Sequence, residues 1–222
     1  VLILLNLRGV KESVVILTPI FITFVATHLI VILISIFGHA GELPKMIIDT
    51  GQETGKAIQT QGFFAILFIL LRAYSLGGGT YTGIEAVSNG MQILREPRVH
   101  TAKRTMFYMA FSLAFTAGGI LLGYLLIKVV PEPGRTLNAV LISKVSENWN
   151  VGGLPIGTVF IYITLIAEGL LLFVAAQSGF LAGPRVLSNM AHDSWVPRRF
   201  SHLSDQLVTK NGIVIMGLAA FA

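Results

Sequence analysis

A long apolar run, from Phe63 to about Leu94, is interrupted by Gly77-Gly78-Gly79-Thr80-Tyr81-Thr82-Gly83-Ile84-Glu85. Four glycines in seven positions make a continuous helix costly, because each Gly loses about 1 kcal/mol against Ala in a helix. Within lipid, an unwound backbone survives only inside the protein or against a water-filled cavity. The sequence therefore predicts a discontinuous membrane helix over residues 63–94.

The polar groups of this break are all oxygen donors. Freed carbonyls near Gly78 and Gly79 come with the hydroxyls of Thr80 and Thr82 and with the carboxylate of Glu85. A carboxylate at that depth is expensive and marks a functional position, and secondary transporters hold substrates and ions at such breaks. We predict that these five residues bind the substrate or an ion. The competing interpretation is a glycine-rich packing seam with a neutral glutamic acid.

The composition indicates a membrane protein. Of the 222 residues, 54% are hydrophobic and 12% are charged, whereas a soluble domain has about 25% charged residues. The chain has no cysteine, which excludes disulfides and thiolate chemistry. Its net charge of +5 is explained by basic residues on cytoplasmic loops, so no nucleic-acid partner is expected.

Apolar runs divide the chain into spans. Complete spans are predicted at residues 14–37, 63–94, 106–130 and 157–187, with partial helices at 1–5 and 212–222. Because the first and last runs are shorter than the ~20 residues of a spanning helix, we interpret the chain as an internal fragment of a longer polytopic protein. It forms a single transmembrane domain in this interpretation, with all-α structure.

Two segments between the spans are polar. Residues 38–61 are expected to form a polar loop, and residues 136–148 a short amphipathic surface helix whose apolar face holds Leu137, Val140, Leu141 and Val145. When the spans are alternated, ten basic residues fall on the side of loops 6–13, 95–104 and 188–211, against five on the other side. These three loops are therefore expected in the cytoplasm.

Further polar side chains lie within the spans. Arg72 precedes Thr82 by about ten residues, roughly 15 Å along a helix, and belongs either to an external gate or to a side chain that snorkels to the outer interface. Glu168 is expected to pair with Arg72 or to line the permeation path, because an unpaired charge is costly there. Gln177 and Ser178 interrupt the same span and are further candidates for coupling or gating.

Three motifs resemble the amino acid–polyamine–organocation permease superfamily. The segment 6–13, Asn6-Leu7-Arg8-Gly9-Val10-Lys11-Glu12-Ser13, resembles the start of its fifth helix. Thr82-Gly83-Ile84-Glu85-Ala86 with Glu96-Pro97 resembles its broken sixth helix and the loop that follows. Gly183-Pro184-Arg185-Val186-Leu187-Ser188-Asn189-Met190-Ala191-His192-Asp193, then Val196-Pro197-Arg198-Arg199-Phe200, resembles the cytoplasmic loop after its eighth helix.

Within that superfamily, the chain is most similar to the KUP-like bacterial potassium importers. The segment Thr82-Gly83-Ile84-Glu85-Ala86-Val87-Ser88-Asn89-Gly90 resembles their sixth-helix motif, and no Lys lies between Lys11 and Lys45, where many proton-coupled amino acid permeases carry one. The resemblance implies a bacterial plasma-membrane protein with a partial LeuT-type inverted-repeat fold, covering the end of helix 4 to the start of helix 9. It also implies that Thr82 and Glu85 lie at the ion site.

The sequence and the resemblance together predict a secondary active transporter that takes up potassium with a coupling proton. No cofactor is expected, no catalytic residue, and no metal beyond a transported cation at Thr82 and Glu85. The lipid bilayer and a small cation or amino acid are the expected partners, and a homodimer is left open. Alternative functions are an amino acid permease of the same superfamily, a sensor or scaffold that lost transport, and an intramembrane enzyme.

Overall fold

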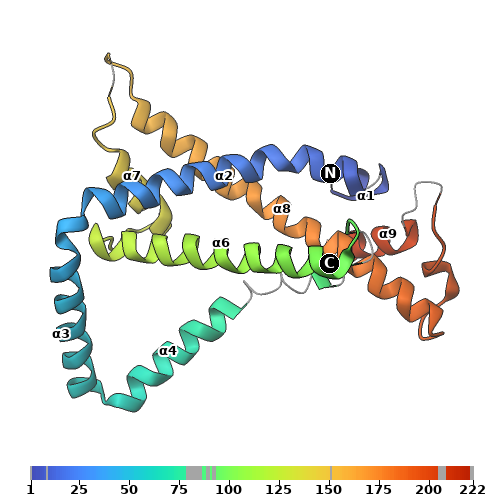
Figure 1. Cartoon of the computed structure of the whole chain (residues 1–222), viewed down its shortest axis with the longest axis horizontal. Helices are drawn as coiled ribbons and strands as arrows, with labels where there is room; N and C mark the ends of the chain where they lie inside the picture. Colours follow the sequence, from blue (N-terminus) through green and yellow to red (C-terminus); the bar gives the residue numbers. More distant parts are fainter. Residues whose placement is uncertain are drawn as a thin grey trace. The chain divides into compact units, whose positions relative to one another are not determined.

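The computed structural model describes residues 2–8, 10–78, 87–88, 91, 94–150, 152–204 and 209–220 (Figure 1). Three helices in these ranges are long and apolar enough to cross a membrane, or up to four spans if one sharply bent helix pair counts as a span. Regular structure in the described residues is helical throughout, which confirms the predicted all-α class. The LeuT-type inverted repeat stays a prediction.

The helices follow one another along the chain in this order: α1 (Leu2–Arg8), α2 (Val10–Gly38), the 3-10 turn η1 (Ala40–Glu42), α3 (Leu43–Gln61), α4 (Phe63–Gly77), α6 (Arg98–Leu126), α7 (Leu137–Ser146), α8 (Ile156–His192), the 3-10 turn η4 (Arg198–Phe200) and α9 (Lys210–Ala219). The three membrane-crossing helices are α2, α6 and α8. The predicted spans 14–37 and 157–187 lie within α2 and α8.

The polar loop expected over residues 38–61 is wrong, because α3 fills most of it (Figure 1). Pro44 lies in the first turn of α3, where its missing N–H has no helical partner to lose. None of the side chains of α3 is buried. Its polarity reflects an exposed amphipathic helix, which polarity alone does not distinguish from a loop.

All three expected cytoplasmic loops are partly helical, and residues 188–192 of the loop expected over 188–211 belong to α8. α6 begins at Arg98, so more than half of the expected loop 95–104 belongs to its first turns. The expected turn over residues 6–13 is helical on both sides of Gly9, a residue that the structure does not describe. Helix boundaries therefore extend beyond the apolar runs, because basic residues at a membrane surface continue a helix as readily as apolar ones.

The chain forms two compact units. The first contains residues 1–26, 83–110 and 163–222, and the second contains residues 27–82 and 111–162. In the second unit, α6 approaches α2 at Gly119 and Gly123, which are one helical turn apart. A Cβ at Gly119 would lie 2.6 Å from Cγ2 of the buried Ile32, and one at Gly123 would lie 3.4 Å from the Cβ of Ser35. Small residues at this spacing let two membrane helices pack closely.

The short helix α7 confirms part of the expectation for residues 136–148. Thr136 is its N-cap, and the Oγ1 atom accepts a hydrogen bond of 3.1 Å from the Ala139 N–H. Val140 and Leu141 are buried as predicted, but Leu137 is exposed, and the buried set also includes Ala139, Ile142 and Ser146. α7 is thus a packed element of the second unit, with Leu141 facing Gly123 of α6.

The connection from α7 to α8 contains a close backbone contact. The Gly157 N–H donates a hydrogen bond of 2.9 Å to the Trp149 carbonyl, and the Trp149 ring lies 4.9 Å from that of Phe160. A Cβ at Gly157 would overlap the carbonyl oxygen of Ser146. Since that atom belongs to the backbone, it moves only if the end of α7 moves.

Gly157→Ala is therefore expected to destabilise the second unit by about 1–3 kcal/mol, as overpacking does. The measurement is the thermal unfolding midpoint of the purified full-length protein. Gly118→Ala is the matched control, because nothing lies within 4 Å of a Cβ at that position and Ala is the better helix former. Equal midpoints for the two variants would contradict the close contact between Gly157 and Ser146.

Candidate functional site

The glycine run that the sequence singles out marks the end of α4. The helix stops at Gly77, and Gly78 keeps helical dihedral angles (φ −59°, ψ −27°) while its N–H donates to the Ser75 carbonyl. Of the five predicted binding residues, only Gly78 is described. Gly79, Thr80, Thr82 and Glu85 lie outside the described residues, so their role and the break in the helix stay predictions.

α4 leads to this glycine run with an apolar, uncovered surface. None of its residues is buried, and the large side chains that it exposes are Phe63, Phe64, Leu67, Phe68, Ile69, Leu70, Leu71, Tyr74 and Leu76. Arg72 is exposed among them. An apolar surface of this extent requires lipid or further helices around it. Arg72 is therefore a charge on an otherwise apolar surface, and both of its predicted roles stay predictions.

A sharp bend separates α4 from the helix that precedes it. α4 and the preceding helical segment Ala40–Gln61 meet at 117° (Figure 1). Gly62, the residue between α3 and α4, has φ +88° and ψ 150°, a backbone conformation that only glycine adopts without strain. The amphipathic α3 and the apolar α4 therefore do not form one straight helix.

The polar residues of α8 lie on two opposite faces of that helix. Thr164, Glu168 and Ser178 share one face, and Gln177 lies on the other, since successive residues turn by about 100°. Thr164 is buried and Glu168 half-buried, and both interact with neighbouring groups. The Ser178 hydroxyl donates a hydrogen bond of 2.7 Å to the Ala175 carbonyl of its own helix. Glu168 is thus the one carboxylate in the described part of α8, and it is half-buried.

The structure does not test the predicted pair between Arg72 and Glu168. Arg72 belongs to the second compact unit and Glu168 to the first. Each residue is therefore placed only within its own surroundings, and their pairing stays a prediction.

Gln177 forms a reciprocal amide pair with Asn6 of α1. Asn6 donates to Gln177 Oε1 at 2.8 Å, and Gln177 donates to Asn6 Oδ1 at 2.9 Å. Asn6 also donates to the Leu2 carbonyl at 2.9 Å, and both amides are buried. Asn6 was expected in a cytoplasmic loop, so this pair was not predicted. The signal was available, because an Asn that follows a run of apolar residues needs a polar partner.

The amide pair fixes how α1 packs on α8. Any rotation or shift of one helix would leave buried amide groups without partners, at a cost of about 1–3 kcal/mol each. Polar side chains between membrane helices commonly specify packing in this way. The contacts give Gln177 a structural role, and a role in gating would require this pair to open.

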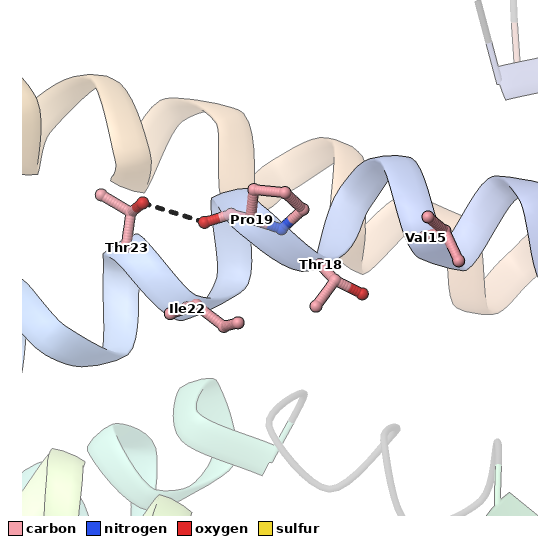
Figure 2. Close-up of a pocket in the computed structure, with 5 residues that line it drawn as sticks. All are labelled: Val15, Thr18, Pro19, Ile22 and Thr23. Atoms are coloured by element: carbon pink, nitrogen blue, oxygen red, sulfur yellow. Dashed lines mark hydrogen bonds between the residues drawn. The ribbon is translucent and has the colours of Figure 1, made fainter.

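Pro19 opens a shallow recess on one face of α2. Figure 2 shows the five residues that line it, Val15, Thr18, Pro19, Ile22 and Thr23, and its volume is about 450 Å³. Pro19 has no N–H, so the Val15 carbonyl receives no helical hydrogen bond from it. The Thr23 hydroxyl donates to the Pro19 carbonyl at 2.9 Å. Pro19 was not among the candidate residues, although a proline inside an apolar run is a readable sign of irregular hydrogen bonding.

The described residues contain no group of three or more His, Cys, Asp or Glu side chains that could hold a metal ion. Hydroxyls, amides and charged groups are instead distributed along apolar helices. Together with the three membrane-crossing helices, this arrangement defines a polytopic integral membrane protein.

Comparison with known proteins assigns the chain to a family. The family model of amino acid permeases matches residues 1–222, and the chain belongs to this family, which is part of the amino acid–polyamine–organocation superfamily. Its members are transporters that move small substrates across membranes. The superfamily resemblance of the three sequence motifs is thereby confirmed.

One curated relative covers nearly the whole chain. The potassium transporter KimA of Bacillus subtilis (strain 168) is 32% identical over 225 residues, which is 99% of this chain and 34% of that protein. The chain thus spans about a third of the length of this relative. No solved structure matches the chain.

The amide pair yields a test by double substitution. Gln177→Leu is expected to lower the stability of the full-length protein by about 1–3 kcal/mol, because it leaves the buried Asn6 amide unsatisfied. The double variant Asn6→Leu with Gln177→Leu is expected to recover most of that loss, since two apolar side chains need no partner. Thermal unfolding in detergent measures both. Additive losses in the double variant would argue against a direct pair.

Proposed function

We propose that the protein is a secondary active permease that imports potassium together with a proton across a bacterial plasma membrane. The observation that carries this proposal is the 32% identity over 99% of the chain to a protein named as a potassium transporter. Family membership alone supports transport of a small substrate, and this relative favours potassium among the substrates of the family.

The chemistry of the glycine break supports a bare cation. After α4 ends at Gly77, the sequence supplies carbonyls, the hydroxyls of Thr80 and Thr82, and the carboxylate of Glu85. Oxygen ligands suit a dehydrated hard cation. The break contains no cationic side chain that would receive the carboxylate of an amino acid. We therefore propose Gly78, Gly79, Thr80, Thr82 and Glu85 as the substrate or ion site, with Glu85 as the proton carrier or a cation ligand.

Other polar residues take supporting roles in this proposal. Arg72, exposed on α4, belongs to the outer gate, and the half-buried Glu168 lines the path or pairs with Arg72. The loops with most basic residues, 6–13, 95–104 and 188–211, lie in the cytoplasm by the positive-inside bias. α4 then enters the membrane from the outside and runs inward to the break.

An amino acid permease is the second candidate function. The description of the matching family favours it. A helix that restarts near Ile84 would present its N-terminus to the break, and such an end can bind a carboxylate. Glu85 would lie in the first turn of that helix, where its own charge competes for the same positive end. This competition is why potassium is the first choice.

Expression of the full-length protein is expected to restore growth of potassium-uptake-deficient cells at limiting potassium. Thr82→Val should impair the rescue by about tenfold in the potassium concentration required, because it deletes one coordinating oxygen at similar volume, a loss of about 1.4 kcal/mol. Thr105→Val is the matched control, since that hydroxyl donates to the Thr101 carbonyl of its own helix. Absent rescue despite confirmed expression, with saturable uptake of a labelled amino acid, would select the second candidate function.

Glu85→Gln keeps the volume of the side chain and most of its hydrogen bonding but removes the charge. We expect near-normal membrane insertion and loss of concentrative uptake in proteoliposomes, because a neutral amide neither carries a proton nor balances a cation. Glu53→Gln on the exposed helix α3 is the control and should transport normally. Uptake by the Glu85 variant with unchanged rate and pH dependence would remove Glu85 from the mechanism.

A further inference from the structure

A second cavity lies in the first compact unit. It has a volume of about 460 Å³ and is named here the arginine pocket. Its polar lining consists of Arg98 at the start of α6, Arg185 and Asn189 of α8, and Ser88 from the segment between α4 and α6. All four residues belong to the same compact unit, so the structure places them together.

The described lining of the arginine pocket carries positive charge. Two guanidinium groups line it, and none of the described lining residues is acidic. Glu96 precedes Arg98 by two residues. Its Oε1 atom lies 2.9 Å from the Arg98 Nε atom, and its Oε2 atom accepts a hydrogen bond of 3.3 Å from the Arg98 backbone N–H. This exposed carboxylate engages one edge of Arg98 and makes no ion pair with Arg185 in the described residues. Within the described part of the chain, no carboxylate pairs with Arg185.

Arg185 also has an unused donor. Its Nη1 atom is buried and has no hydrogen-bond partner in the described part of the chain. A buried donor without a partner is costly, and more so when it is charged. An anion in the pocket would supply the missing acceptor and balance the charge. The pocket is thus favourable for a ligand with several negatively charged oxygens.

The donor set favours a phosphate group among such ligands. The planar guanidinium binds phosphate through two parallel hydrogen bonds, and a serine hydroxyl and an asparagine amide can donate to further oxygens. Asn189 follows Arg185 by four residues, so both lie on the same face of α8. A tetrahedral phosphate presents enough acceptors for two arginines and these two neutral donors at once.

The other walls of the arginine pocket are apolar. Met91, Val99 and Val186 complete the lining. α8 begins at Ile156, and about 20 residues of a helix cross the hydrocarbon layer, so Arg185 lies beyond the hydrocarbon at the membrane surface. Basic pockets between membrane helices at this level suit lipid headgroups, and the volume is typical of a ligand pocket, about 300–1,000 Å³.

We propose that the arginine pocket binds a phosphate group, carried either by the headgroup of an anionic phospholipid or by a soluble phosphate compound. None of the described lining residues belongs to the site proposed for transport, so this inference does not depend on which solute the permease carries.

Binding is tested on the full-length protein in nanodiscs. One arm compares phosphatidylcholine alone with phosphatidylcholine containing phosphatidylglycerol, and a second arm adds inorganic phosphate to phosphatidylcholine nanodiscs. Thermal stabilisation and native mass spectrometry measure binding without any transport assay. Arg185→Gln and Arg98→Gln are each expected to weaken binding about tenfold or more, as loss of a charge-assisted contact does. Arg185→Lys, which keeps the positive charge but loses the paired N–H donors of the guanidinium, should weaken binding less.

Arg104→Gln is the matched control, because Arg104 belongs to the same basic segment but donates to Tyr108 at 2.7 Å and does not line the pocket. It should bind like the unsubstituted protein. Binding of phosphatidylglycerol alone would identify a lipid headgroup as the source, and binding of inorganic phosphate would identify a soluble compound. No binding in either arm, or an equal loss in Arg104→Gln and Arg185→Gln, would overturn the proposal.

Discussion

Helix packing in this chain depends on places where a glycine lets another group come closer than a side chain would allow. Gly119 meets Ile32, Gly157 meets the Ser146 carbonyl, and Gly212 lies where a Cβ would be 2.9 Å from that of Pro184. Lipid is as apolar as the helices, so no hydrophobic force drives them together in the membrane. Dispersion contacts must do so, and they weaken steeply with distance. These three glycines therefore allow close packing of α6 on α2, of α8 on α7 and of α9 on α8.

The sequence predicts the long helices well, because continuous apolar runs depend only on local residues. α2 and α8 follow the predicted spans. α3 was mistaken for a loop, since a polar amphipathic helix and a polar loop have similar composition. α7 was correctly expected to be helical, but its buried residues were only partly identified. Their burial depends on contacts such as the one between Leu141 and Gly123, which residues distant in sequence create.

The same division between local and distant information applies to the functional residues. Short motifs were sufficient for the superfamily. Gln177 was selected as a candidate for coupling or gating because it interrupts an apolar span together with Ser178. Its partner Asn6 was missed, since 171 residues separate the two and no local pattern connects them. The arginine pocket was missed for the same reason. The hydroxyls and the carboxylate of the glycine break remain predictions from sequence, because the structure does not describe them.

Because of the bend at Gly62, the length of α4 sets how deep its glycine run lies in the membrane. An amphipathic helix such as α3 rests at the boundary between headgroups and hydrocarbon, and the 117° bend then directs α4 into the bilayer from a fixed level. α4 has 15 residues, which measure about 22 Å along a helix axis. This length is more than half of a hydrocarbon layer of about 30 Å. Lengthening α4 by one residue would move the glycine run by about 1.5 Å along the helix axis and turn it by about 100°. The number of residues between Gly62 and Gly77 therefore sets both the depth of the glycine run and the direction in which it faces.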